Sequence, residues 1–132
     1  MYKFLAISLL SFFIASISHA SIVGKGLFCA NEKGNNPFFG YFKDSKTFEL
    51  FGISGYEITV KERLYTLDGT KTIRVDISRS NYIYYYINRQ TLKIRREMNF
   101  SPFATCVVAN SRMELIRQIQ SIINKAKNKN KI

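Results

Sequence analysis

Histidine is almost absent from this sequence. The one histidine, His19, falls inside an apolar N-terminal segment that we interpret as a removable leader. The rest of the chain therefore has no imidazole for a Ser-His-Asp triad, a Cys-His pair or a histidine-ligated metal ion. Pairs of carboxylates remain, but none has a spacing that sets it apart from ordinary solvated charge. We predict a protein that is not an enzyme and that holds no metal ion or other cofactor.

Cysteine is nearly as scarce, because the chain has only Cys29 and Cys106. These two lack the Cys-x-x-Cys spacing of redox-active or metal-binding pairs, and no histidine is at hand to complete a metal site. Two cysteines near opposite ends of an exported domain favour one structural disulfide. Such a bridge closes most of the domain, and the chain-entropy account gives it about 4 to 5 kcal/mol of stabilisation.

Acidic side chains are also few. Nine Asp and Glu stand against 20 Lys and Arg, which gives a formal net charge of +11. A charge of this size attracts polyanions, and in an exported context these are anionic lipid, lipopolysaccharide, teichoic acid or released nucleic acid. A second interpretation, that the many lysines reflect genome composition, stays open.

What the sequence does have, at its start, is an apolar leader. Residues 1–3 carry one positive charge, the run from Phe4 to Ser18 is almost purely apolar, and Ala20 closes a small-x-small pattern. This is typical of a secretory signal peptide, residues 1–20. The run is shorter than the roughly twenty residues of a membrane-spanning helix, so we do not expect an integral membrane protein. We expect an exported protein, periplasmic or extracellular, in which residues 21–132 form one domain with a net charge of +10, since cleavage removes Lys3.

Short apolar segments separated by turn residues follow the leader, and this pattern is typical of antiparallel β structure. The Asp68-Gly69 pair is the strongest hairpin signal, because a type I′ turn needs positive φ at both central positions. In the predicted strand 56–67, the alternation of apolar and polar residues is lost near Glu62 and Arg63, which predicts a β-bulge there. The predicted class is mainly β, a small antiparallel barrel or a curled meander of seven to eight strands. We expect strands at residues 22–30, 38–43, 47–53, 56–67, 71–78, 82–88, 91–96 and 104–109.

The apolar period changes from two to 3.6 at Ser111, which predicts a C-terminal amphipathic helix over about residues 111–127. Ser111 and Glu114 form a capping-box pattern at its start. The apolar stripe is expected to pack on the sheet or to plug a barrel mouth. The alternative is a basic helix lying on an anionic membrane. The candidate residues for that membrane or partner surface are the lysines of the basic tail, Lys125, Lys127, Lys129 and Lys131.

Tyrosines and cations alternate on one face of the predicted meander. Matching the apolar faces of its strands places Tyr84 between Asp76 and Arg95, and Tyr86 between Arg74 and Lys93. Flat rings between cations suit a surface that stacks on bases or sugars while its charges hold phosphate or carboxylate. The alternative is that these pairs only stabilise the sheet. The candidate ligand-binding residues are Arg74, Tyr84, Tyr86, Lys93 and Arg95.

Phenylalanines crowd the first third of the domain, and most are expected in the core. Some of them, left uncovered, would line a pocket or an exposed patch. The residues are Phe28, Phe38, Phe39, Phe42, Phe48 and Phe51.

Three segments together resemble a known type of protein: Gly26-Leu27-Phe28-Cys29, the stretch from Tyr85 to Lys93, and Cys106. The chain resembles short, exported, uncharacterised bacterial β-rich proteins with one cysteine near each end of the domain. The resemblance covers residues 24–109 and implies export and the disulfide, but no activity. Periplasmic lysozyme inhibitors are similar in size, but a basic chain would repel basic lysozyme. Lipocalins are similar in layout, but the tryptophan of their opening motif is missing here.

Together these observations predict an exported, non-enzymatic binding module for an anionic partner of the envelope or the extracellular space. The alternative is a small periplasmic binding protein for an apolar ligand, held by the phenylalanines, or for a protein partner. Binding of the first kind weakens steeply with salt, and binding of the second kind does not.

Overall fold

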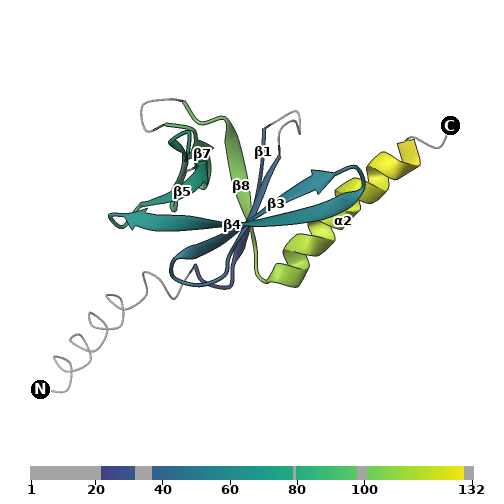
Figure 1. Cartoon of the computed structure of the whole chain (residues 1–132), viewed down its shortest axis with the longest axis horizontal. Coiled ribbons are helices and arrows are strands. Elements are labelled where there is room, and N and C mark those ends of the chain that lie inside the picture. Colours follow the sequence, from purple (N-terminus) through teal and green to yellow (C-terminus); the bar gives the residue numbers. More distant parts are fainter. Residues whose placement is uncertain (1–21, 32–36, 79, 98–100, 130–132) are drawn as a thin grey trace, which may run out of the picture.

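A computed structural model describes residues 22–31, 37–78, 80–97 and 101–129. The predicted leader, residues 1–20, lies outside this part of the chain. The described residues form a closed antiparallel barrel of eight strands and one helix, α2 (Arg112–Lys129) (Figure 1). The mainly β prediction is confirmed, with the barrel in place of the open meander. The strands are β1 (Gly26–Ala30), β2 (Phe38–Phe42), β3 (Thr47–Ser54), β4 (Glu57–Asp68), β5 (Thr72–Ser78), β6 (Ile83–Asn88), β7 (Lys93–Arg95) and β8 (Ala104–Ala109).

Each strand pairs with the next one in the sequence, and β8 pairs with β1 to close the barrel. Two of the tight connections depend on glycines in the left-handed region, with φ of 61° at Gly55 and 71° at Gly69. The hairpin predicted at Asp68-Gly69 forms between β4 and β5, but the predicted type I′ turn was wrong, because Asp68 is still paired with Thr72 and only Gly69 of the two has a positive φ. Closure pairs the first strand with the last, whereas residues 57–64 of β4, which lie beyond the stretch paired with β5, have register partners on β3 alone.

The predicted disulfide lies at the point where the barrel closes. Cys29 of β1 and Cys106 of β8 are register partners, with their Cα atoms 3.9 Å apart, and their sulfurs are bonded. Both side chains are buried in the barrel interior. The bond therefore ties the first strand directly to the last.

The barrel wall separates two apolar layers. Inside it, inward-facing side chains from the strands pack on one another, and Phe38, Phe42 and Phe48 lie with ring centroids 5.0 to 5.8 Å apart. Outside it, the helix covers a smaller layer. Since the phenylalanines are shared between the two layers, they form core rather than one open pocket. The outer layer consists of Phe39, Phe51, Ala109, Leu115, Ile119 and Ile123.

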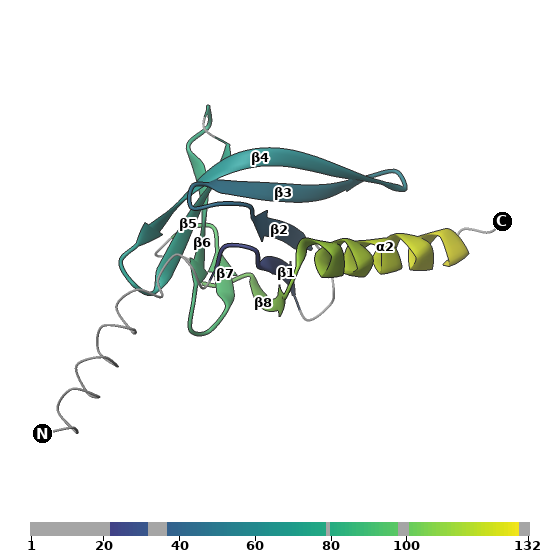
Figure 2. The ribbon, with the colours of Figure 1, turned by 90° about the horizontal axis from the view of Figure 1, so that it is seen from below.

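Strand β4 contains no bulge at Glu62 and Arg63, so that prediction was wrong. Its pairing with β3 runs unbroken from Thr47↔Leu64 to Ser54↔Glu57. The alternation changes phase because the two halves of β4 bury different faces. Tyr65 faces the barrel interior, whereas Ile58 faces the helix layer. The hairpin of β3 and β4 extends past the rest of the barrel, alongside α2 (Figure 2).

The helix begins with the predicted cap, shifted in one detail. Ser111 Oγ accepts a hydrogen bond from the Glu114 amide at 3.1 Å, while Glu114 Oε2 accepts one from the Asn110 amide at 2.7 Å, one residue earlier than a capping box requires. Arg112 then donates to the buried carboxylate of Glu49 at 2.9 Å. Together the cap and the ion pair hold the start of α2 on the outer wall of the barrel, where it packs instead of plugging a mouth.

Candidate functional site

The candidate ligand surface is the outer face of β5, β6 and β7. Alternation along β6 turns Ile87 and Tyr85 into the barrel, where the Tyr85 ring lies 5.4 Å from those of Phe38 and Phe103. The residues between them, Tyr84 and Tyr86, consequently lie on the outside, half-buried among their neighbours. This is the orientation that the sequence predicts for these tyrosines.

Tyr86 lies between two arginines. It is the register partner of Arg74 on β5 and of Arg95 on β7. Tyr84 is the register partner of Asp76, and the Arg74 guanidinium carbon lies 4.9 Å from the centroid of the Tyr84 ring. Each tyrosine ring thus has at least one guanidinium in a neighbouring position, an arrangement in which ring and cation attract each other.

The predicted register between β6 and β7 was wrong by two residues. Arg95, not Lys93, faces Tyr86, and Lys93 instead pairs with Thr105 on β8. The connection is longer than predicted, because the Leu92 amide donates to the Asn88 carbonyl at 2.8 Å and Leu92 adopts a φ of 58°. Strand β7 therefore starts at Lys93. A shift of two residues keeps the same faces outward, so the cations stay on the outer surface.

An acid lies within this cationic surface. Arg74 Nε and Asp76 Oδ1 are 3.8 Å apart, and both atoms are buried without a hydrogen-bond partner in the protein. This distance is too long for a hydrogen bond, so Asp76 offsets part of the Arg74 charge without using its donor. The face keeps an excess of positive charge, because Arg95 and Lys93 accompany the pair.

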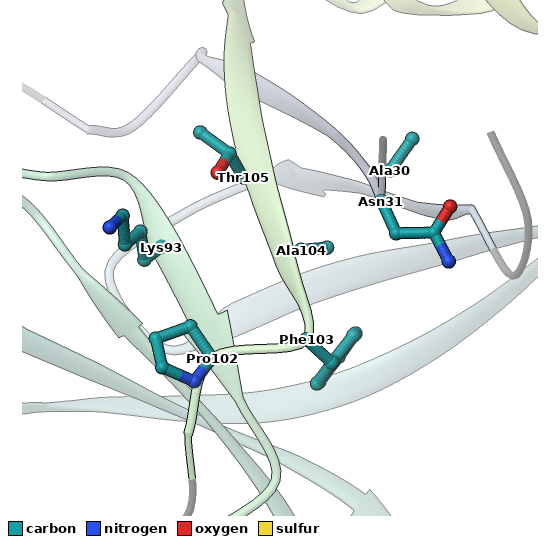
Figure 3. A pocket seen from close by; sticks show the side chains of 7 residues that line it. All are labelled: Ala30, Asn31, Lys93, Pro102, Phe103, Ala104 and Thr105. Atoms are coloured by element: carbon teal, nitrogen blue, oxygen red, sulfur yellow. The ribbon is translucent and has the colours of Figure 1, made fainter. Parts of the chain in front are cut away.

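Lys93 belongs to a different part of the surface from the tyrosines. It lines an open hollow of about 650 Å³ at the ends of β1, β7 and β8 (Figure 3). The structure thus brings Arg74, Tyr84, Tyr86 and Arg95 together and places Lys93 beside them, toward β8. The hollow is lined by Ala30, Asn31, Lys93, Pro102, Phe103, Ala104 and Thr105.

The basic tail lies on the other side of the molecule. Lys125, Lys127 and Lys129 are exposed near the end of α2, whereas β5, β6 and β7 lie across the barrel from it (Figures 1 and 2). The Lys127 ammonium lies 5.4 Å from the ring centroid of Tyr56, at the tip of the β3–β4 hairpin. The buried stripe of α2 faces the barrel, and the lysines lie on its exposed surface together with Met113 and Arg117. Lys131 lies outside the described residues.

The structure also bears on two other kinds of site, a cluster of metal ligands and a membrane-spanning helix. Within residues 22–31, 37–78, 80–97 and 101–129, no three His, Cys, Asp or Glu side chains gather closely enough to hold a metal ion. Over the same part of the chain, no helix has the length and apolar character to cross a bilayer.

No protein-family model, curated protein or solved structure matches this chain. The resemblance to short exported bacterial proteins therefore stays a prediction. The disulfide itself fits an oxidising compartment outside the cytoplasm, because thiols in the cytosol are kept reduced.

Proposed function

We propose that this protein is an exported, non-enzymatic binding module for an anionic partner of the cell envelope or the extracellular space. The observation that carries the proposal is the position of Tyr86 between Arg74 and Arg95 on adjacent strands. An antiparallel sheet holds such register partners about 5 Å apart, so the ring and both guanidinium groups are presented together.

The chemistry of this face suits a ligand with both flat or saccharide rings and anionic groups. Arginine binds phosphate and carboxylate through paired N–H donors, and exposed tyrosine rings stack on bases or sugars. The Arg74 guanidinium carbon lies 4.9 Å from the centroid of the Tyr84 ring, so a cation accompanies this tyrosine too. Lipopolysaccharide carries sugar rings with phosphates and nucleic acid carries bases with phosphates, so both fit the face better than a simple anionic lipid does.

The basic tail has a separate role in this proposal. Because Lys125, Lys127 and Lys129 lie across the barrel from the tyrosines, they do not complete the same short-range site. They raise the positive potential of the whole molecule, which speeds its encounter with an anionic surface.

The test is binding of the oxidised, secreted protein to lipopolysaccharide, to anionic vesicles and to single-stranded nucleic acid over a series of salt concentrations. The test variant is Tyr86→Ala/Arg95→Ala. The matched control is Tyr56→Ala/Arg117→Ala, which removes one ring and one guanidinium on the helix side of the molecule. Circular dichroism verifies that both variants remain folded.

We expect the test variant to bind one partner class at least about tenfold more weakly, since losing one stacked ring alone costs about 1 to 3 kcal/mol. The binding constant of the test variant should also fall less steeply as salt is added. The slope of its logarithm against the logarithm of the salt concentration should change by about the amount that one phosphate contact contributes. The control should bind like the unaltered protein. Equal losses in both variants would mean that only the total charge matters, and the proposed face would be rejected.

A further inference from the structure

A second candidate site lies inside the wall of the barrel, at one of its ends. Here an open cavity of about 230 Å³ has an apolar lining and two cations, Lys25 and Arg89. Its lining contains no carboxylate. The deepest apolar residues, Phe42, Ile73 and Ile87, belong to the buried interior, whereas Val108 at the mouth is 38% exposed. The apolar lining consists of Ile22, Leu27, Phe42, Ile73, Ile87, Leu92 and Val108.

Two turns place the cations beside this cavity. The first, from Ile22 to Lys25, is closed by a 3.0 Å hydrogen bond from the Lys25 amide to the Ile22 carbonyl, and the Gly24 amide anchors it to Phe42 at 2.8 Å. The second carries Arg89, whose amide donates to the Lys71 carbonyl at 2.7 Å. Since backbone hydrogen bonds fix the main chain of both turns, the residues that carry the two cations lie beside the cavity before any ligand arrives.

The charge at this end of the barrel favours an anion. The Lys25 ammonium donates to the side-chain oxygen of Asn110 at 3.3 Å, and this partner is a neutral amide. An anionic head group at Lys25 would therefore displace a neutral hydrogen-bond partner and not a carboxylate. The apolar floor excludes an ion that is charged throughout, because it would bury charge against side chains that offer no hydrogen bonds.

The volume limits the length of the apolar part. The cavity is smaller than the roughly 300 to 1,000 Å³ of pockets for drug-sized ligands. It equals the space of about seven or eight water molecules. A methylene group takes up about as much space as one water, so an unbranched tail of roughly six to eight carbons fills it.

We propose that this cavity binds a small amphipathic anion, with a carboxylate or phosphate head at Lys25 and Arg89 and an unbranched aliphatic tail of six to eight carbons inside the barrel. The site is independent of the proposed anionic surface. Ile73 and Ile87 point inward, whereas their chain neighbours Arg74 and Tyr86 point outward, so the two sites use opposite faces of the same wall.

The experiment titrates the oxidised, secreted protein with octanoate, octyl phosphate, octanol and acetate. Binding is measured by calorimetry and by the NMR methyl signals of Ile73, Ile87 and Val108. We expect saturable binding of octanoate or octyl phosphate with shifts at these methyls, and the tighter of the two identifies the head group. Octanol lacks the charge and acetate lacks the tail, so both should bind at least about tenfold more weakly. No saturable binding of either anion, or shifts confined to other methyls, would overturn the proposal.

Variants separate the two parts of the site. Lys25→Met/Arg89→Met should weaken the anion at least about tenfold while leaving octanol unchanged, since the apolar floor is intact. The control Lys61→Met/Arg117→Met removes one ammonium and one guanidinium from exposed residues that do not line the cavity, and it should bind like the unaltered protein. Equal losses in the two double variants would reject the assignment of the head group.

A third variant fills the cavity. Val108→Phe adds volume at the exposed mouth and should abolish binding of octanol and of both anions, with folding verified by circular dichroism. Retained binding in this variant would contradict the cavity as the site. The test also stays distinct from that of the proposed function, because Tyr86→Ala/Arg95→Ala should keep octanoate binding, and Lys25→Met/Arg89→Met should keep the polyanion binding.

Discussion

Removing the bridge between Cys29 and Cys106 tests how the barrel is held closed. The bond joins residues 77 apart in the sequence, and it lies between the strands that begin and end the barrel. When the bond is absent, the unfolded chain regains the freedom of a loop that spans nearly the whole barrel. For a loop of this length the chain-entropy account gives about 4 to 5 kcal/mol at 25 °C.

This loss is large for so small a domain. Domains are typically stable by about 5 to 15 kcal/mol, so the Cys29→Ala/Cys106→Ala variant should lose a third or more of its free energy of unfolding. The measurement is urea unfolding followed by far-UV circular dichroism. The slope with urea should rise in the variant, because the unfolded chain without its cross-link exposes more surface. A loss below about 2 kcal/mol with an unchanged slope would refute this reasoning.

The rate at which a reductant breaks the same bond in the folded protein tests how well the barrel protects it. Both sulfurs are buried in the interior, so dithiothreitol should reach them only after the barrel opens. The second-order rate constant of reduction should therefore be far smaller in the folded protein than in the same protein unfolded in urea. Similar rate constants in the two states would mean that the bond is accessible in the closed barrel.

Two other substitutions test the interior of the barrel. Gly40→Ala should destabilise the fold by about 1 to 3 kcal/mol or more, because the new Cβ would lie 1.7 Å from Cζ of the fully buried Phe48 ring. Thermal unfolding measures this loss, and Gly40→Ala/Phe48→Leu should recover part of it. Burial, and to a smaller extent the charge of Asp44, raises the pKa of Tyr65, whose hydroxyl donates to the Asp44 carbonyl at 2.6 Å. The unfolded chain therefore ionises first, so the stability that Tyr65 contributes is complete below its ordinary pKa of about 10 and is lost as the pH rises further. Tyr65→Phe should flatten that alkaline decline in urea unfolding at pH 8 to 11, and an unaltered decline would contradict the assignment.

Local sequence patterns predicted most of the elements here, because the helix and the strands other than β4 each bury one continuous face. Asp68-Gly69 signalled a hairpin through its backbone preferences, and Ser111 with Glu114 signalled a helix start through its capping groups. The disulfide followed from the number and placement of the cysteines alone. The hairpin and the helix start each depend on a few neighbouring residues, and the disulfide depends on the number of cysteines. All three can therefore be predicted without the tertiary structure.

The candidate site was predicted less completely, because its details depend on how turns set register. The sequence placed Tyr84 and Tyr86 outward correctly, since orientation depends only on alternation. It did not predict that Leu92 adopts a left-handed conformation, and this residue moves Arg95 opposite Tyr86. Leucine does not favour that region, so Leu92 gave no sign of the longer turn, although Asn88, whose side-chain oxygen accepts from the Gln90 and Thr91 amides, is a residue typical of turns.

The burial of strand β4 and the inner cavity were also not predicted from local sequence patterns, because both depend on contacts between segments that are distant in the sequence. The phase change along β4 signals a bulge when a strand is assumed to have one buried face, yet here one half of the strand packs inside the barrel and the other half under a helix about fifty residues later. Lys25 and Arg89 likewise converge only because Gly24 bonds to Phe42 and Arg89 bonds to Lys71, through contacts between segments distant in the sequence. A pattern local to one segment carries no information about which distant segment covers it. Sites built across the closure of a barrel therefore have to be derived from the folded geometry, and in this protein that geometry supplies an outer cationic face and an inner apolar cavity from the two faces of one wall.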